Sequence, residues 1–139
     1  MDKNFIKNYG GRDYYFPCSK KKDLAADCVA RAIAIALDMD WLYVMKELFA
    51  HGLMLGRMPN EPKTYASFLK MHGWVKQKTL KDKNGKKYRL HNWPLTKGNF
   101  IIHTTNHVTA MVDGVVNDSW DCSPWCANIY YCKEELVQS

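Results

Sequence analysis

The sequence has no apolar run approaching the ~20 residues that a membrane-spanning helix needs. Its first eight residues, MDKNFIKN, lack the apolar core of a signal peptide. We therefore expect a cytoplasmic protein that does not enter a membrane. The five cysteines are odd in number and contain no Cys-x-x-Cys pair, which argues against a complete disulfide framework and predicts reduced thiols. There is no internal repeat, and we expect no cofactor.

The length of the chain limits its architecture. A chain of 139 residues corresponds to a single domain, which we expect to span residues 1–139. A chain near 150 residues buries roughly 68–70% of the surface that its unfolded form exposes, so it needs neither a disulfide nor a metal to hold a core. The hydrophobic fraction of 47% is consistent with such a globular protein.

The net charge of +6 is concentrated in one segment. Between Val75 and Arg89 a single acidic residue, Asp82, accompanies seven basic ones: Lys76, Lys78, Lys81, Lys83, Lys86, Lys87 and Arg89. A local basic patch can bind nucleic acid or an acidic partner, but most charge runs are simply solvated surface. A nucleic-acid-binding module that uses the segment 76–89 is therefore kept as an alternative and is not favoured.

The first half of the chain has the pattern of helices. Apolar residues at helical spacing predict helices over 28–37, 41–50 and 63–72. Asp40 is a suitable N-cap for the second helix, and Gly52 and Gly73 are placed to end the second and third helices. Glycines and prolines predict a loop over 52–62. Residues 1–20 are too rich in aromatic side chains for disorder, so we expect an irregular or partly extended arm that packs over the core.

The second half has the pattern of strands. Alternating and apolar runs predict strands over 74–80, 86–90, 99–104, 107–112, 115–120 and 128–132. Asn84-Gly85 and Asp113-Gly114 are hairpin-turn signals. Helices followed by hairpin-connected strands predict an α+β fold in which N-terminal helices pack on a C-terminal antiparallel sheet.

Cys28 lies in the first turn of the first predicted helix. Asp27, just before it, is a good N-cap residue because its carboxylate can accept a first-turn N–H. A thiol in this position feels the positive end of the helix dipole, which favours the thiolate. A free cysteine is also among the most buried residue types. The position alone therefore leaves two interpretations of Cys28, a nucleophile and a small core residue.

The hairpin with its turn at 113–114 supplies candidate partners for this thiol. If the turn is a two-residue loop, counting by twos along both strands places His107 and Asp118 on one face, diagonal to each other. Asp118 could then fix the tautomer of His107 and leave the other ring nitrogen available to a thiol. A three-residue loop would exchange the two faces and make Asn117 the third member instead.

A nucleophile, a base and an orienting residue are the three parts of a covalent acyl-transfer site. The order Cys28, His107, Asp118, with the cysteine on a helix and the other two on strands, resembles the papain-like cysteine peptidases. Asp118-Ser119-Trp120 is similar to the Asn-Ser-Trp of papain enzymes, where the tryptophan shields the hydrogen bond between histidine and asparagine. Small uncharacterised papain-fold proteins of bacteria and their phages look similar in four segments: 27–34, 107–110, 113–114 and 118–121.

This resemblance implies a papain-like fold over roughly residues 24–132 and a cysteine-dependent hydrolase, a peptidase or an amide or isopeptide hydrolase. It implies that Cys28 is the nucleophile, that His107 is the general base and acid, that Asp118 orients His107, and that Trp120 supports the site. We expect no metal in such a site. The implied substrate is a peptide or protein. If the loop 52–62 and the basic segment 76–89 border the cleft, we expect that substrate to be acidic.

The chain departs from the papain pattern at the oxyanion hole. Papain-like enzymes usually carry a glutamine six residues before the cysteine, as a donor to the oxyanion, and Lys22 occupies that position here. The chain also lacks the Gly-Ser-Cys-Trp motif of papain. The backbone N–H of Cys28 can still donate, and Lys22 and Asn106 are candidates for the second donor. Without a second donor, the fold could persist without efficient hydrolysis.

Two more alternatives remain open at this point. A papain fold that has lost catalysis would act as an inhibitor or a binding protein. A zinc site could use Cys122, Cys126 and Cys132 together with Cys18 or His103, although this spacing is not that of a recognised zinc motif.

Overall fold

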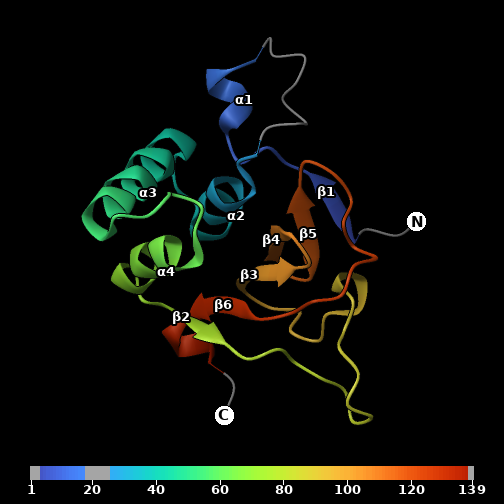
Figure 1. Cartoon of the computed structure of the whole chain (residues 1–139). Coiled ribbons are helices and arrows are strands. Elements are labelled where there is room, and N and C mark those ends of the chain that lie inside the picture. Colours follow the sequence, from blue (N-terminus) through green and yellow to red (C-terminus); the bar gives the residue numbers. More distant parts are fainter. Residues whose placement is uncertain (1–3, 18–25, 138–139) are drawn as a thin grey trace.

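A computed structural model describes residues 4–17 and 26–137, which form an α+β fold of four α-helices and one six-stranded mixed sheet (Figure 1). The helices are α1 (Arg12–Tyr15), α2 (Cys28–Leu37), α3 (Trp41–Leu55) and α4 (Pro62–Met71). The strands are β1 (Phe5–Lys7), β2 (Trp74–Gln77), β3 (Asn99–Thr104), β4 (His107–Val112), β5 (Val115–Asp118) and β6 (Tyr130–Lys133). Among the described residues, no helix is long and apolar enough to cross a membrane.

The sheet has the strand order β1-β5-β4-β3-β6-β2. Its paired strands are antiparallel, except that β1 runs parallel to β5. The expectation of a purely antiparallel sheet is therefore wrong at this edge. The N-terminal arm, expected to pack over the core, contributes an edge strand instead, and the backbone N–H of Asn8 donates to the carbonyl of Asp118 at 2.7 Å.

Two apolar clusters lie on opposite faces of the sheet. One includes Ala30 and Ile33 of α2 and Ala110 of β4, and it fills the space between the sheet and the helices α2, α3 and α4 (Figure 1). The other includes Trp93 and Met111. Ala110 and Met111 are consecutive in β4, so their side chains point to opposite faces. The small alanines of α2 let this helix lie close against β4.

The hairpin of β4 and β5 has the register that the sequence predicts. Val112 pairs with Val115, so the loop is the two residues Asp113 and Gly114. Their φ angles are 48° and 84°, and two positive φ angles are what a type I′ turn requires. Because the loop has two residues rather than three, Asp118 keeps the face assigned to it.

The basic segment does not form the expected two-stranded hairpin. A turn is present, since the N–H of Gly85 donates to the carbonyl of Asp82 at 2.9 Å. Only one isolated bridge, between Lys81 and Lys87, joins the two sides, and β2 pairs with β6 instead. Facing lysines repel each other across a strand pair, whereas β6 offers β2 a buried, apolar neighbour.

Helix α3 continues five residues beyond its predicted end at residue 50. Gly52 lies inside the helix, which ends at Gly56 in the left-handed conformation (φ 68°). The chain folds back at this point, and the N–H of Arg57 donates to the carbonyl of Gly52 at 2.9 Å. A Cβ atom on Gly52 would lie 2.5 Å from the carbonyl oxygen of Arg57. Glycine is thus needed for close backbone approach and not as a helix stop.

We expect Gly52→Ala to destabilise the fold. In an unobstructed helix this change would stabilise by up to about 1 kcal/mol. Here the added methyl group meets backbone and forces a shift, which typically costs about 1–3 kcal/mol. Urea unfolding measures the difference. The neighbouring Leu53→Ala is the control, because Leu53 is 85% exposed and its loss should stay within about 0.5 kcal/mol. A gain of stability in Gly52→Ala would contradict this account.

Candidate active site

His107 and Asp118 form the tightest contact of the candidate site. His107 begins β4 and Asp118 ends β5. The His107 Nε2 atom lies 2.6 Å from Asp118 Oδ2, and the two side chains are 9% and 3% exposed. The other carboxylate oxygen, Oδ1, accepts the backbone N–H of Ser119 at 2.7 Å. This arrangement fixes the ring and leaves Nδ1 of His107 for another partner.

Two thiols act on this ring, that of Cys28, the first residue of α2, and that of Cys122. Burial raises the pKa of Cys28, but the hydrogen bond with His107 lowers it, as do the N–H of Val108 and the charges of His107 and Arg31, and the net direction is downward. Burial lowers the pKa of His107, but its hydrogen bonds, above all with Asp118, raise it to about 11. Both shifts favour a thiolate beside an imidazolium.

Arg31 joins this group to the interior of the fold. It lies one turn after Asp27 on α2, is 4% exposed, and its guanidinium forms ion pairs with both Asp27 and Asp118, the second at 3.5 Å. Asp27 does not cap α2 as predicted, since its side chain makes no capping hydrogen bond. Its carboxylate instead accepts the indole N–H of Trp41 at 3.0 Å and lies 3.6 Å from Nε of Arg12.

The sequence reasoning missed Arg31. The signal that could have identified it was the spacing of four residues between Asp27 and Arg31, which places an acid and a base on one side of a helix. That spacing predicts the ion pair between Arg31 and Asp27. It does not predict the second ion pair, with Asp118, because Asp118 is 87 residues further along the chain.

The fallback residue, Asn117, lies away from the imidazole. Its side-chain oxygen Oδ1 accepts a hydrogen bond from the side-chain nitrogen of Asn8 at 3.0 Å. Its side-chain nitrogen Nδ2 donates to the backbone carbonyl of Val115 at 3.1 Å. Asn117 therefore holds the N-terminal arm against β5, and the alternative of Asn117 as the partner of His107 is wrong.

Trp120 and Cys122 complete the surroundings of the imidazole. The rings of Trp120 and His107 have centroids 4.9 Å apart at 44°, so the indole covers the ring while remaining 37% exposed. Cys122, which the sequence did not connect with this site, is fully buried and lies 3.6 Å from Asp118 Oδ2. Burial raises its pKa, which makes it a neutral neighbour rather than a second nucleophile.

In the part of the chain that the structure describes, Cys122, Cys126 and Cys132 do not come together as a group of metal ligands. Among the described residues, His107, Asp118 and Cys122 are the potential metal ligands that come together, with their ligand atoms within 4.8 Å of one another. Cys126 is exposed and Cys132 is buried in the second apolar cluster. Of the two candidates for a fourth zinc ligand, Cys18 lies outside the described residues, and His103 has its Nε2 atom 3.1 Å from the Tyr65 hydroxyl. The three ligand atoms belong to the hydrogen-bonded group described above, in which Asp118 already balances two cationic partners.

A cavity of about 410 Å³ opens beside Cys28 and His107. It lies between the N-terminal ends of α2 and α4 and the turn that joins β3 to β4. Tyr65 and His103 also line it, and the Tyr65 hydroxyl lies 3.1 Å from His103 Nε2. Burial lowers the pKa of His103 to about 4, so this pair is neutral at neutral pH.

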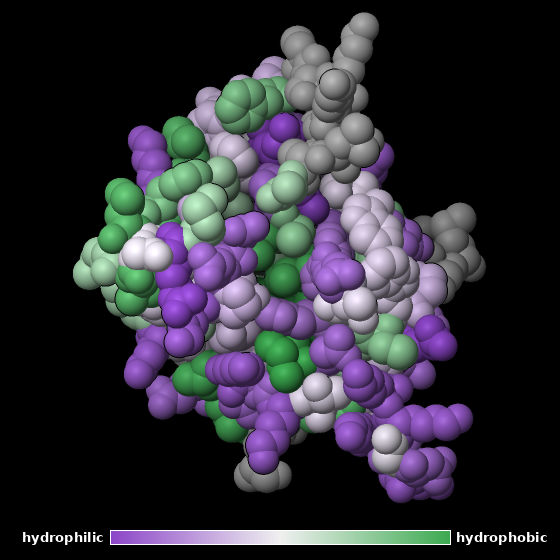
Figure 2. Space-filling model, in the orientation of Figure 1, coloured by the Kyte–Doolittle hydropathy of each residue, from purple (hydrophilic) through white to green (hydrophobic). Residues whose placement is uncertain are grey.

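The cavity contains some of the expected cleft residues and not others. Asn60 and Asn106 line it, so the predicted loop 52–62 does border it. None of the basic residues of 76–89, all of which are described, is in its lining. The turn of that segment projects at the lower edge of the view (Figure 1), as a hydrophilic protrusion (Figure 2). The reason given for an acidic substrate is therefore lost. Lys22 lies outside the described residues.

No family model, curated protein or solved structure matches the chain.

We expect Arg31→Met to destabilise the protein strongly. The change leaves two buried carboxylates, Asp27 and Asp118, without their shared cation, and breaking such a buried pair typically costs about 3–5 kcal/mol. Arg57→Met is a matched control, because Arg57 forms an ion pair of the same four-residue spacing with Glu61, but on the surface. Its loss should be marginal. Urea unfolding compares the two, and equal losses would mean that the buried network contributes no more than a surface pair.

Proposed function

We propose that this protein is a papain-like, cysteine-dependent amide hydrolase with Cys28 as its nucleophile. The observation that carries the proposal is that Cys28 of α2 and His107 of β4 line one cavity and shift each other's pKa toward a thiolate and an imidazolium, while Asp118 of β5 holds the His107 ring at 2.6 Å. An activated thiol, a base and a group that orients the base are the parts that thiol acyl transfer needs. An accessible cavity beside the thiol and the imidazole offers room for a substrate.

The geometry supports a two-step reaction. The Cys28 thiolate attacks the carbonyl carbon of an amide, and the imidazolium of His107 gives its proton to the departing amine, which leaves a thioester on the sulfur. Water then attacks the thioester, His107 removes a proton from that water, and the acid is released, which restores the Cys28 thiolate and the His107 imidazolium. Asp118 stays ionised throughout and stabilises the imidazolium.

Donors for the oxyanion come from the start of α2. The N–H groups in the first turn of a helix have no partner within the helix, and Cys28 is the first residue of α2. Its backbone N–H is therefore the first proposed donor. Asn106 is the proposed second donor, because it lines the same cavity and sits in the tight turn between β3 and β4 with φ at 61°. Peptides and proteins are the proposed substrates.

Alkylation with iodoacetamide tests the nucleophile without a known substrate. We expect Cys28 to react fastest of the five thiols, with a half-maximal rate below pH 9.0, the ordinary value of a thiol pKa. Cys126 is the control, because it is exposed while Cys28 is only partly so, and exposure alone would make Cys126 react first. Peptide mapping by mass spectrometry separates the two. Faster labelling of Cys126 at pH 6–7 would refute the proposed nucleophile.

Substitution of His107 tests the ion pair. Removing the imidazolium in His107→Gln removes interactions that favour the thiolate, so the pH of half-maximal alkylation of Cys28 should rise. On a fluorogenic peptide pool, the same variant should lose about 10²–10⁴-fold in rate, which is the usual contribution of a general acid and base. A wild-type protein with an activated Cys28 and no hydrolysis of any peptide would favour the alternative of an inactive papain-fold binding protein.

A further inference from the structure

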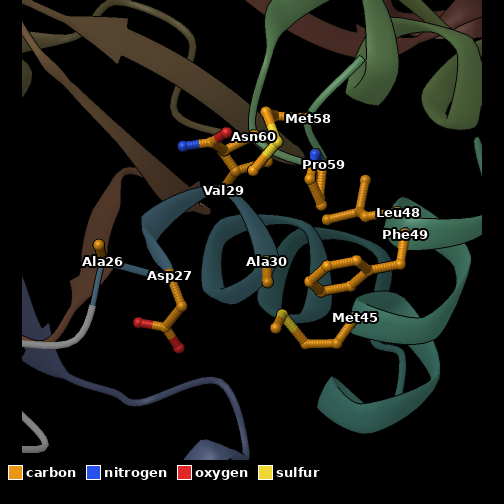
Figure 3. A pocket seen from close by; sticks show the side chains of 10 residues that line it. All are labelled: Ala26, Asp27, Val29, Ala30, Met45, Leu48, Phe49, Met58, Pro59 and Asn60. Carbon is orange, nitrogen blue, oxygen red and sulfur yellow. The ribbon is translucent and has the colours of Figure 1, made fainter. Parts of the chain in front are cut away.

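A second hollow adjoins the cavity on the helical side of Cys28. This groove, which we call the α2–α3 groove, has a volume of about 190 Å³ and lies between the first turn of α2, the middle of α3 and the loop before α4 (Figure 3). Its walls are mostly carbon and sulfur. The apolar residues that line it are Ala26, Val29, Ala30, Met45, Leu48, Phe49, Met58 and Pro59.

Two of its apolar side chains are unusually open to solvent. Phe49 is 52% exposed and Met58 is 63% exposed, and they stand on opposite walls of the groove (Figure 3). The carboxylate of Asp27, although close by, points away from the groove (Figure 3) toward its bonds with Arg31 and Trp41. Among the described residues, the groove is therefore an apolar surface with no charged side chain aimed into it.

The groove is continuous with the cavity that contains the thiol. Three residues, Ala26, Val29 and Asn60, line both hollows. Cys28 lies in the same first turn of α2, next to Val29. A chain bound across Cys28 would therefore reach the groove within one or two residues of the bond under attack.

The position of His107 decides which part of the substrate the groove would hold. The general acid must stand next to the leaving amine, and His107 lines the cavity but not the groove. The sheet borders only the cavity, whereas α3 borders only the groove. The amine thus departs on the sheet side of Cys28, and the acyl part that stays on the sulfur lies on the α3 side.

We propose that the α2–α3 groove binds an apolar side chain in the acyl part of the substrate, which makes the substrates peptides with a residue such as leucine, methionine or phenylalanine just before the cleaved bond. This inference rests on the proposed function. A volume of about 190 Å³ is below the 300–1,000 Å³ of sites for whole small molecules, so it suits one side chain. Its two methionines are flexible and polarizable and can adapt to different apolar shapes.

Peptidyl acyloxymethyl ketones that differ in one side chain test the substrate class. Each probe places Leu, Phe, Gly, Asp or Lys at the first or second position before the electrophilic carbon, and mass spectrometry gives its rate of labelling Cys28. We expect the Leu and Phe probes to exceed the Gly, Asp and Lys probes at least about tenfold at one of these positions, since even one methylene changes selectivity by about 10–200-fold. Equal rates at both positions would overturn the proposal.

Matched variants test the groove itself. Met58→Glu places a charge in the groove, whereas Met54→Glu places the same charge on an 84% exposed position of α3 that lines neither hollow. We expect the ratio of Leu-probe labelling to iodoacetamide labelling to fall at least about tenfold in Met58→Glu and to stay unchanged in Met54→Glu. Phe49→Ser, compared with Leu53→Ser, repeats the test with an uncharged residue.

The two proposals can fail separately. If both members of each matched pair give the same ratio, the groove does not select the acyl side chain, although Cys28 can still be the nucleophile. If iodoacetamide does not prefer Cys28 over Cys126 in the wild-type protein, the proposed function fails and the groove proposal fails with it.

Discussion

The carboxylate of Asp118 is the point on which the rest of the structure depends. It is 3% exposed at the side chain and stands between the imidazole of His107 and the guanidinium of Arg31. A buried carboxylate is costly unless it is paired and hydrogen-bonded, so the fold must bring both cations to it. The imidazole comes from β4 and the guanidinium from α2. Because both must reach Asp118, they constrain how α2 lies on the hairpin of β4 and β5.

This constraint accounts for the composition of α2. To deliver both the guanidinium of Arg31 and the thiol of Cys28 to the hairpin, the helix must lie close to β4, and its buried residues include four alanines. The N-terminal arm is held to the same helix. A Cβ on Gly10 would stand 3.1 Å from the backbone of Arg31, and Gly10 has a φ of 67°, so both the close approach to α2 and the backbone conformation favour glycine there. Packing and charge thus hold the same three segments together: the N-terminal arm, α2 and the hairpin of β4 and β5.

The sequence was most informative where structure depends on near neighbours. The helix 28–37 follows from apolar residues that recur with the helical period of 3.6. The placement of His107 and Asp118 on one face follows from the strand period of two and a two-residue turn. Both were predictable from the sequence. The pairings of β1 with β5 and of β2 with β6 join segments far apart in the chain. No turn sequence connects these strands directly, so their pairing could not be predicted. Asp27 was mispredicted for the same reason. Its local sequence favours a helix cap, but in the fold its carboxylate bonds to the distant Trp41 and to the buried Arg31 instead.

The charges of the candidate site alternate along one path. From Arg12 the path runs through Asp27, Arg31, Asp118 and His107 to Cys28. Neighbouring charges on it have opposite signs, and the six charges sum to zero when the thiolate and the imidazolium are both present. In the proposed reaction, transfer of the proton between sulfur and ring would keep this sum, and so would formation of a thioester with loss of that proton to an amine. A partly buried site can support such chemistry because no step of it leaves the interior with an unbalanced charge.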